Sequence, residues 1–298
     1  MTQHSQSVLY FAASPAYFVS SSQDSSIKIW DLEYLRCKYS LDGHKGPVLF
    51  ITVYKQFLIS AGSDKAIKIW NLENKKCNVT LYGHLGCVYS LAVFDDILFC
   101  GCQDATIQYF NLESVFASIS QNPEVHLALE SHFESFRNSH NGFVYCLTST
   151  PKCLISGAGD GLIKIWNVLK SNPKITLDLV KVLSGHKGRV NTIVMDEANL
   201  YSGSSDCTVK VWDLDSFYLT RTLTGHTDEI LSVAVNPFFV ISGCYDGSIY
   251  IWDKKTTNLL QKLVHPDIVH AVFIKDDLLL SGNNKGHIKI WKLPTSQT

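Results

Sequence analysis

The sequence predicts an all-β fold in which seven repeated units close into a ring. A similar phrase, such as KAIKIWNL at residues 65–72, occurs seven times, each time with an aromatic residue near its end. Within each phrase apolar residues alternate with polar ones, which is the two-residue period of a β-strand. The aromatics are 40, 40, 56, 46, 40 and 39 residues apart, at Trp30, Trp70, Phe110, Trp166, Trp212, Trp252 and Trp291. A period near 40 with four strands per unit is typical of a β-propeller.

A common internal register supports the same fold. Histidine stands 26 residues before every aromatic, serine stands ten before it in six units, and aspartate stands six before it in six units. The histidines are His4, His44, His84, His140, His186, His226 and His265. The serines and aspartates are Ser20, Ser60, Ser156, Ser202, Ser242, Ser281, Asp24, Asp64, Asp104, Asp160, Asp206 and Asp246. Seven matches in seven units cannot arise by chance, so the units are true repeats.

On these residues the chain resembles the WD40-repeat family over essentially its whole length. The resemblance implies a single seven-bladed WD40 β-propeller over residues 1–298, with strands a to d in each blade. It also implies that Asp, His, Ser and Trp form a hydrogen-bonded tetrad that ties the b–c turn to the d–a loop. The tetrads expected to be complete are His44, Ser60, Asp64, Trp70; His140, Ser156, Asp160, Trp166; His186, Ser202, Asp206, Trp212; and His226, Ser242, Asp246, Trp252.

Each tetrad contains the residue types of a hydrolase triad, so a catalytic interpretation has to be considered. A catalyst needs one such site beside an oxyanion hole, whereas these sets repeat around the ring. A buried carboxylate or imidazole is costly unless it has a partner, which gives each set a structural purpose. We therefore expect a non-enzymatic protein without catalytic residues, cofactor or metal.

Two blades depart from the pattern. Blade 3 has Cys100 in place of serine and Phe110 in place of tryptophan. Blade 7 has Lys285 at the aspartate position, within the turn Asn283-Asn284-Lys285-Gly286. Because each lost hydrogen bond removes about 1 kcal/mol, we expect these two blades to be the softer ones.

The last blade is expected to lack its outermost strand. His4 already occupies the d–a position of blade 1, and only residues 292–298 follow Trp291. Strand c near Gly286–Trp291 would then have an unpaired outer edge, which invites strand addition. Two alternatives remain open here: a partial clasp by terminal residues, and a sequence that is part of a longer chain.

Two long gaps locate insertions in adjacent blades. The aromatic spacing leaves 16 extra residues between Phe110 and Trp166, and 6 between Trp166 and Trp212. Alignment backwards from the next histidine puts strand d of blade 3 at residues 133–138, so the insertions are c–d loops at about 114–131 and 169–177. A short helix after Pro123 is conceivable, but we expect a solvated loop.

In the family that the chain resembles, the top face carries residues three after each histidine and one before each turn aspartate. These positions hold Ser7, Pro47, Cys87, Phe143, Arg189, Glu229, Ile268, Gln23, Ser63, Gln103, Gly159, Ser205 and Tyr245. Phe143, Arg189 and Tyr245 are of types enriched in binding hot spots. The predicted partner-binding residues are Phe143, Arg189, Glu229, Tyr245 and Ile268. A phosphate reader is not favoured, because only Lys45 and Lys187 accompany Arg189.

Composition limits the classes of partner. With 26 Lys+Arg against 27 Asp+Glu, the chain has no general attraction for nucleic acid or for an anionic membrane. The nine cysteines are scattered and the N-terminus has no secretory signal, which favours reduced thiols in the cytoplasm, with the nucleus possible as well. Protein partners are therefore expected.

A closer resemblance concerns blade 3 and the residues after its insertion. GCQDATIQYFNL at residues 101–112 and HNGFVYCL at residues 140–147 resemble the WD-repeat region of the fungal di- and tripeptidase subunit of the alternative glutathione-degradation complex. That resemblance implies a peptidase or a glutamine-amidotransferase-like subunit as a partner in glutathione catabolism. Three hypotheses follow: an interaction scaffold, a docking subunit of such a peptidase assembly, and a substrate adaptor of a ubiquitin ligase.

Overall fold

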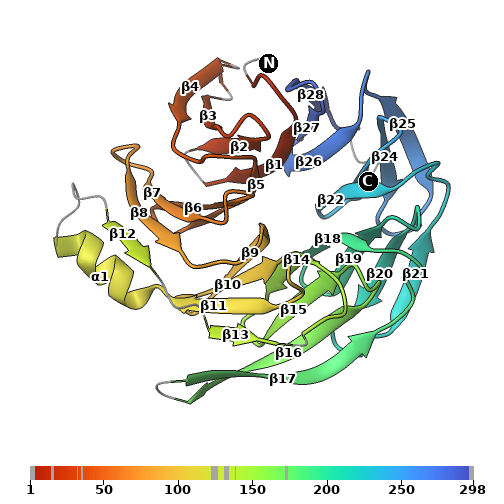
Figure 1. Cartoon of the computed structure of the whole chain (residues 1–298). Coiled ribbons are helices and arrows are strands. Elements are labelled where there is room, and N and C mark those ends of the chain that lie inside the picture. Colours follow the sequence, from red (N-terminus) through yellow and green to blue (C-terminus); the bar gives the residue numbers. More distant parts are fainter. Residues whose placement is uncertain are drawn as a thin grey trace.

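The computed structural model describes residues 4–14, 17–31, 33–34, 36–121, 127–130, 134–137, 139–171 and 174–294. Seven antiparallel sheets stand around a central axis like the blades of a propeller (Figure 1). The innermost strands face the axis and the later strands of each sheet form the rim. The predicted all-β, seven-bladed propeller is therefore confirmed.

The first four blades come from the N-terminal part of the chain. Blade 1 consists of β1 (Val8–Ala13), β2 (Phe18–Ser22), β3 (Ile27–Asp31) and β4 (Arg36–Leu41). Blade 2 consists of β5 (Val48–Tyr54), β6 (Phe57–Gly62), β7 (Ile67–Asn71) and β8 (Cys77–Tyr82). Blade 3 consists of β9 (Val88–Phe94), β10 (Ile97–Cys102), β11 (Ile107–Asn111) and β13 (Glu134–Phe136). Blade 4 consists of β14 (Val144–Ser149), β15 (Cys153–Ala158), β16 (Ile163–Ser171) and β17 (Lys174–Leu183).

The remaining three blades complete the ring. Blade 5 consists of β18 (Val190–Met195), β19 (Asn199–Ser204), β20 (Val209–Asp213) and β21 (Leu219–Leu223). Blade 6 consists of β22 (Ile230–Val235), β23 (Phe239–Cys244), β24 (Ser248–Asp253) and β25 (Leu259–Val264). Blade 7 consists of β26 (Val269–Lys275), β27 (Leu278–Asn283) and β28 (Ile288–Lys292). The prediction that the last blade has three strands is confirmed, and residues 1–3 and 295–298, which a terminal clasp would use, lie outside the described residues.

The hydrophobic core lies between neighbouring blades. One cluster, for example, joins Ile155 and Ile163 of blade 4 to Val190 and Trp212 of blade 5. Burying such a side chain contributes about 1.5–3 kcal/mol. Because each blade shares its core with the next, the apolar side chains of a strand are buried only when the neighbouring blade packs against them.

The b–c turn repeats the same backbone conformation in every blade. The residue after the turn aspartate, or after Lys285 in blade 7, has a positive φ of 63–82°: Ser25, Lys65, Ala105, Gly161, Cys207, Gly247 and Gly286. A non-glycine residue pays about 1 kcal/mol or more for this left-handed conformation. At Gly286 a Cβ atom would also collide with the backbone carbonyl of His4, so glycine is required where blade 7 meets blade 1.

The first insertion is folded, so the prediction of a solvated loop is wrong where the structure describes it. Helix α1 (Glu113–Gln121) begins where Asn111 accepts a hydrogen bond from the backbone of Glu113, and it lies before Pro123. It buries Val115 and Ile119, a four-residue spacing that places both on one face. Residues 122–126 lie outside the described part of the chain. The expected strand d at 133–138 is present as β13, with residues 133 and 138 likewise undescribed.

The insertion also adds a strand to the preceding blade. Strand β12 (Leu127–Glu130) pairs in parallel with β8, so the sheet of blade 2 has five strands (Figure 1). Sequence spacing cannot predict this pairing, because the insertion belongs to blade 3 in the sequence but its strand β12 pairs with blade 2.

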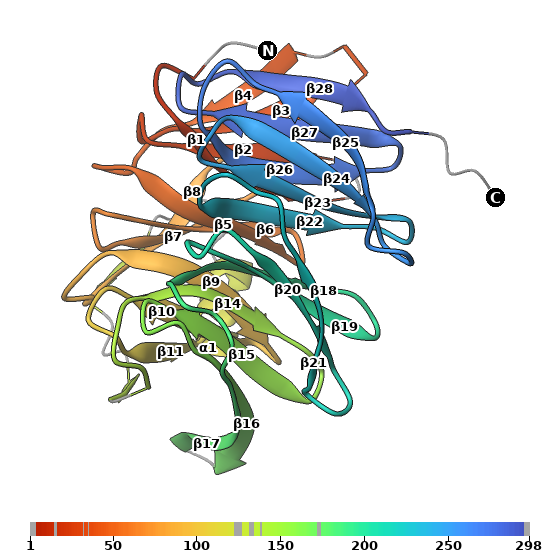
Figure 2. The same ribbon diagram turned by 90° about the vertical axis from the view of Figure 1, so that its right-hand side faces the viewer.

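The second insertion is also not a loop. Strands β16 and β17 continue through most of residues 169–177 as a long hairpin, which projects from the rim beyond the other strands (Figure 2). Ile175 and Leu177 pack against the cluster shared by blades 3 and 4, and the backbone of Ile175 donates a hydrogen bond to the Tyr109 hydroxyl at 3.2 Å. These contacts explain why the extra residues extend the strands.

Candidate interaction surface

Blade 2 shows how the four repeated residues are joined. The indole N–H of Trp70 donates to Ser60 Oγ at 2.8 Å, and the Ser60 hydroxyl donates to His44 Nε2 at 2.8 Å. The Nδ1–H of His44 donates to the Asp64 carboxylate at 2.8 Å, as does the backbone N–H of Lys45. Because Nε2 of His44 accepts from Ser60 and Nδ1 donates to Asp64, these hydrogen bonds hold His44 as the Nδ1–H tautomer.

The same chain of bonds recurs in three further blades. Ser20, Ser156 and Ser202 each accept from the tryptophan of their blade at 2.7–2.9 Å. Each of these serines lies 2.7 Å from the histidine of its blade. The histidines in turn contact Asp24, Asp160 and Asp206 at 2.8–3.1 Å. Blade 1 thus has a complete set as well, which the sequence register already contained.

The tetrad serines are not positioned as nucleophiles. Ser20, Ser60, Ser156, Ser202, Ser242 and Ser281 are all 0% exposed. A nucleophile has to reach a substrate, and these buried hydroxyls instead contact the tryptophan of their own blade and, except for Ser281, its histidine. The geometry therefore accounts for the repeated Ser, His and Asp as a structural device.

Blade 6 has the right residues in a different arrangement. His226 and Trp252 contact Ser242 Oγ at 2.7 and 3.3 Å, whereas among the described residues Nδ1 of His226 has no hydrogen-bond partner. The Asp246 carboxylate accepts instead from the Thr227 and Tyr250 hydroxyls. The Tyr250 ring lies 4.4 Å from the imidazole, centroid to centroid, where blades 2 and 5 carry lysine. The sequence alone could not predict that the Tyr250 hydroxyl, and not His226, would donate a hydrogen bond to Asp246.

Blade 3 replaces the tetrad with sulfur contacts. Cys102 Sγ lies 3.7 Å from Nδ1 of His84, and Cys100 is fully buried where serine stands in the other blades. The exposed Asp104 carboxylate accepts from the hydroxyl and the backbone of Thr106. Burial lowers the pKa of His84 to about 4, so the imidazole is neutral.

In blade 7 an asparagine contacts the histidine, whereas an aspartate does so in blades 1, 2, 4 and 5. Asn283 is completely buried, and its amide nitrogen lies 3.2 Å from Nδ1 of His265. Because an amide nitrogen only donates, Nδ1 of His265 accepts here, the reverse of its role in blade 2. Lys285, at the aspartate position, pairs with Asp267 at 3.4 Å.

The structure connects four of the five predicted partner-binding residues at the top face, the face formed by the d–a loops and b–c turns. Arg189 forms an ion pair with Glu229 at 2.6 Å, and the backbone of Tyr245 donates to the Glu229 carbonyl. Phe143 and Tyr245 are 40% and 48% exposed. Ile268 is half-buried and accepts a backbone bond from Asn284 in blade 7.

An aromatic cluster that sequence reasoning missed lies beside the ion pair. Tyr89 stacks on Phe143 and lies 5.1 Å from Tyr145, centroid to centroid. The Arg189 guanidinium sits 5.8 Å from the centre of the Tyr145 ring, at cation–π distance. Tyr89 and Tyr145 both stand five residues after their blade's histidine, so the register could have identified them.

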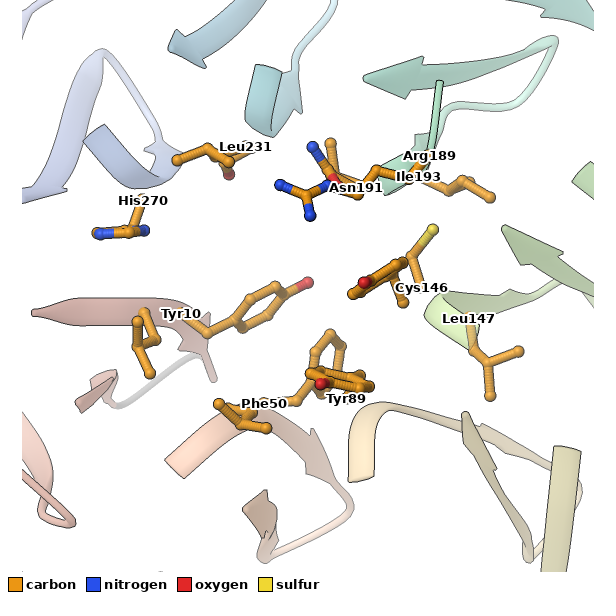
Figure 3. Close-up of a pocket in the computed structure, with 15 residues that line it drawn as sticks. Tyr10, Phe50, Tyr89, Cys146, Leu147, Arg189, Asn191, Ile193, Leu231 and His270 are labelled. Atoms are coloured by element: carbon orange, nitrogen blue, oxygen red, sulfur yellow. The ribbon is translucent and has the colours of Figure 1, made fainter. Parts of the chain in front are cut away.

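A central cavity of about 280 Å³ opens between the innermost strands of all seven blades (Figure 3). Tyr10 reaches into it from one side, and Arg189 and Asn191 lie on the other. Tyr10 also packs on Phe50 with 4.1 Å between ring centroids. His270 lines the wall from blade 7, and burial lowers its pKa. The cavity therefore offers aromatic surfaces and a few polar groups.

Metal sites and membrane spans are the two other features that bear on function. No group of three or more His, Cys, Asp or Glu side chains in the described part of the chain could hold a metal ion. None of the helices described is long and apolar enough to cross a membrane.

The sequence matches a known family of repeats. The family described as "WD domain, G-beta repeat" matches six segments, at residues 1–31, 35–71, 75–111, 132–167, 177–213 and 217–253. These are the units that end at Trp30, Trp70, Phe110, Trp166, Trp212 and Trp252. The matched segments cover well over half of the chain.

Similar curated proteins share only part of this chain. Zinc finger CCCH domain-containing protein 59 of Arabidopsis thaliana is 33% identical over 107 residues, which are 33% of this chain and 23% of that protein. Kinesin-like protein KIF21B of Mus musculus is 32% identical over 78 residues, 26% of this chain and 4% of that protein. F-box and WD repeat domain containing protein 10B of Homo sapiens is 35% identical over 65 residues, 22% of this chain and 8% of that protein. The chain spans less than a quarter of the length of each.

A solved structure is similar over almost the whole chain. The crystal structure of the computationally designed Ika8 protein superposes with a TM-score of 0.72 at 25% sequence identity. The superposition covers 97% of this chain and 97% of that chain. This likeness concerns the fold.

Proposed function

The chain belongs to the WD40-repeat family, and on that premise we propose that it is a non-catalytic scaffold that binds a partner protein on its top face. The observation that carries the proposal is the Arg189–Glu229 ion pair beside the aromatic cluster of Tyr89, Phe143 and Tyr145, of which Phe143 is exposed. Aromatic residues and arginine supply most of the energy at protein interfaces. We further propose that residues 1–298 act as one domain.

The proposed site on the top face combines two kinds of recognition. Phe143 and Tyr245 present exposed apolar surface, and Arg189 and Glu229 present opposite charges that a partner can complement. Because the ion pair is partly exposed, it contributes little to stability and its charges remain available to a ligand. Tyr89 and Tyr145 hold Phe143 in place, which lowers the entropy lost on binding.

A direct test compares two triple variants by quantitative pull-down from native lysate. The Phe143→Ala/Arg189→Glu/Tyr245→Ala variant should lose its main partner, with at least a tenfold drop in recovery. The control variant, Tyr34→Ala/Tyr218→Ala/Leu260→Ala, removes side chains of the outer strands and rim that are 50–67% exposed, and should retain it. Equal recovery by both variants would refute the top-face site.

The identity of the partner is a finer proposal. A peptidase or glutamine-amidotransferase-like subunit of glutathione catabolism is suggested by the resemblance of residues 101–112 and 140–147, and by that resemblance alone. Such a partner, and a cytoplasmic or nuclear location, would appear in the same pull-down and in cell fractionation. Unchanged glutathione turnover in a deletion strain would contradict it.

A ubiquitin-ligase adaptor is the second candidate, because an F-box and WD repeat protein is among the similar proteins. The similarity covers 22% of this chain, and so supports the repeat more than the ligase. Recovery of a protein that carries an F-box together with the chain would favour this function, and its absence from a saturating pull-down would count against it.

A further inference from the structure

The central cavity is lined unevenly around the ring. Seven of its lining side chains stand five residues after the histidine of their blade, and all seven are half-buried because they line this cavity. They are Leu9, Leu49, Tyr89, Tyr145, Asn191, Leu231 and His270. Blades 1, 2 and 6 thus contribute leucines, and blades 3 and 4 contribute tyrosines. An occupant of the cavity would meet aliphatic and aromatic walls together with polar groups.

Tyr10 forms the floor of the central cavity. A second cavity of about 230 Å³ lies deeper among the same innermost strands, and Tyr10, Thr192 and Ser232 line both. The Tyr10 ring is held against Phe50, and Figure 3 shows its hydroxyl pointing into the central cavity. A ligand in this cavity would therefore meet a hydroxyl at its inner end.

Some polar groups of the cavity have no partner within the protein. No described residue forms a hydrogen bond with the hydroxyl of Tyr10 or of Thr192. Burial raises the pKa of Tyr10, so its hydroxyl stays protonated and can both donate and accept. Asn191 uses its amide nitrogen on the Ile230 carbonyl at 2.8 Å, which leaves its side-chain oxygen as an acceptor. A ligand that displaces water from the cavity has to supply hydrogen bonds to these groups.

The charge of the cavity favours a neutral ligand. Arg189 is the one ionised side chain among the described residues that line it, since burial lowers the pKa of His270 and keeps that imidazole neutral. The Arg189 guanidinium is already paired with Glu229 at 2.6 Å and lies 5.8 Å from the centre of the Tyr145 ring. An anion would compete with Glu229, and a cation would be repelled by Arg189. Neither is therefore the expected ligand.

We propose that the central cavity binds a neutral aromatic ring that carries a hydroxyl group. The ring packs between the leucines and the tyrosines, and its hydroxyl forms a hydrogen bond with Tyr10. An apolar cavity of about 150 Å³ already holds benzene, so the 280 Å³ of this cavity has room for a substituted phenol. Phe143 and Tyr245 do not line the cavity, so binding of a free phenol does not depend on the function proposed for the top face.

A matched pair of probes tests the hydrogen bond. Para-cresol and toluene differ by one hydroxyl, and titration calorimetry with the whole chain should show saturable binding of para-cresol at millimolar concentration. Toluene should bind about tenfold more weakly, because it leaves the Tyr10 hydroxyl unpaired. The Tyr10→Phe variant should bind both probes with equal affinity, since the contact that distinguishes them is gone. Equal affinity for both probes in the unaltered chain would overturn the proposal.

A pair of tryptophan variants tests the location. Leu231→Trp fills the cavity and should abolish detectable binding of para-cresol. The control Leu260→Trp adds the same ring to the exposed rim of blade 6 and should bind as the unaltered chain does. Circular dichroism of both variants excludes unfolding as the cause of a loss. In crystals grown with para-bromophenol, the anomalous signal of bromine should lie inside the cavity, and bromine bound only elsewhere would refute the site.

Competition identifies the source of the ring. Excess para-cresol in the native pull-down should release the partner if the ring is a tyrosine of that partner, whereas a retained partner identifies a free phenol as the ligand. A top-face triple variant that keeps its partner would leave the calorimetry unchanged, so the two proposals fail separately. The absence of saturable para-cresol binding at millimolar concentration would refute this inference alone.

Discussion

Blades 2 and 7 are built from the same repeat, yet the first is the most enclosed sheet of the ring and the second the least. Blade 2 has five strands, a complete tetrad, and helix α1, whose Phe116 stacks on Phe57 at 5.1 Å. Blade 7 has three described strands, a half-buried Trp291 and an asparagine beside its histidine. The difference teaches that what covers a blade decides its stability as much as the repeat does.

Lowering the pH should produce the largest difference in stability between blade 2 and blade 7. Burial lowers the pKa of His265 to about 4, and it does the same for His4, His84 and His226, from 6.5 in the unfolded chain. The unfolded chain therefore binds more protons below pH 6.5, and stability falls as the pH drops from 6.5 towards 4. Blade 7 should open first, because no carboxylate of its own b–c turn pairs with a charged His265, whereas Asp64 accepts from His44 in blade 2.

Thermal unfolding between pH 7.5 and 4.5, followed by hydrogen exchange at pH 7 and pH 5.5 corrected for intrinsic rates, checks this order. A melting temperature that stays flat from pH 7 to pH 5 would contradict the role of the buried histidines. Earlier opening of blade 2 would contradict the comparison itself.

Truncation of the paired tryptophans should have the next largest effect. Trp70→Ala is expected to lower the free energy of unfolding by about 4 kcal/mol, since it leaves a large cavity in a closed blade. Trp291→Ala is expected to cost about 2 kcal/mol, because the ring is already partly exposed and the site is free to collapse. Urea unfolding measures both, and equal losses would show that blade 7 is covered in solution.

Removing the helix anchor should cost less than truncating Trp70. Ile119→Ala is expected to cost about 2–3 kcal/mol, because Ile119 is buried in the cluster that α1 shares with blades 2 and 3. The matched control is Ser120→Ala, on the exposed side of the same turn, which should change stability by less than about 0.5 kcal/mol. A cost below that value for Ile119→Ala would mean that the helix is not docked.

Much of the fold could be predicted because the repeat is a local pattern. The 26-residue spacing from His44 to Trp70 fixes three strands and two turns in each unit, and its repetition fixes the number of blades. The insertions could not be placed this way. Helix α1 forms where Asn111 caps it and blade 2 buries Ile119, and neither condition is visible in the spacing.

The candidate surface was predicted in part. Phe143, Arg189, Glu229 and Tyr245 followed from their distance to the histidine or to the turn aspartate, and they lie close together. Tyr145 was missed, although it lies beneath Arg189, because its position faces the axis and gains meaning only once seven strands surround it.

By itself, then, the sequence determined the seven units, the strands of the repeat and the tetrads of blades 2, 4 and 5, because hydrogen-bonded turns and alternating side chains act within about 40 residues. Only the tertiary structure decided where β12 pairs, how Asp246 turns towards Tyr250, and where helix α1 docks. Those outcomes depend on contacts between blades or on which neighbour wins a shared partner, and such competition is settled by packing in three dimensions.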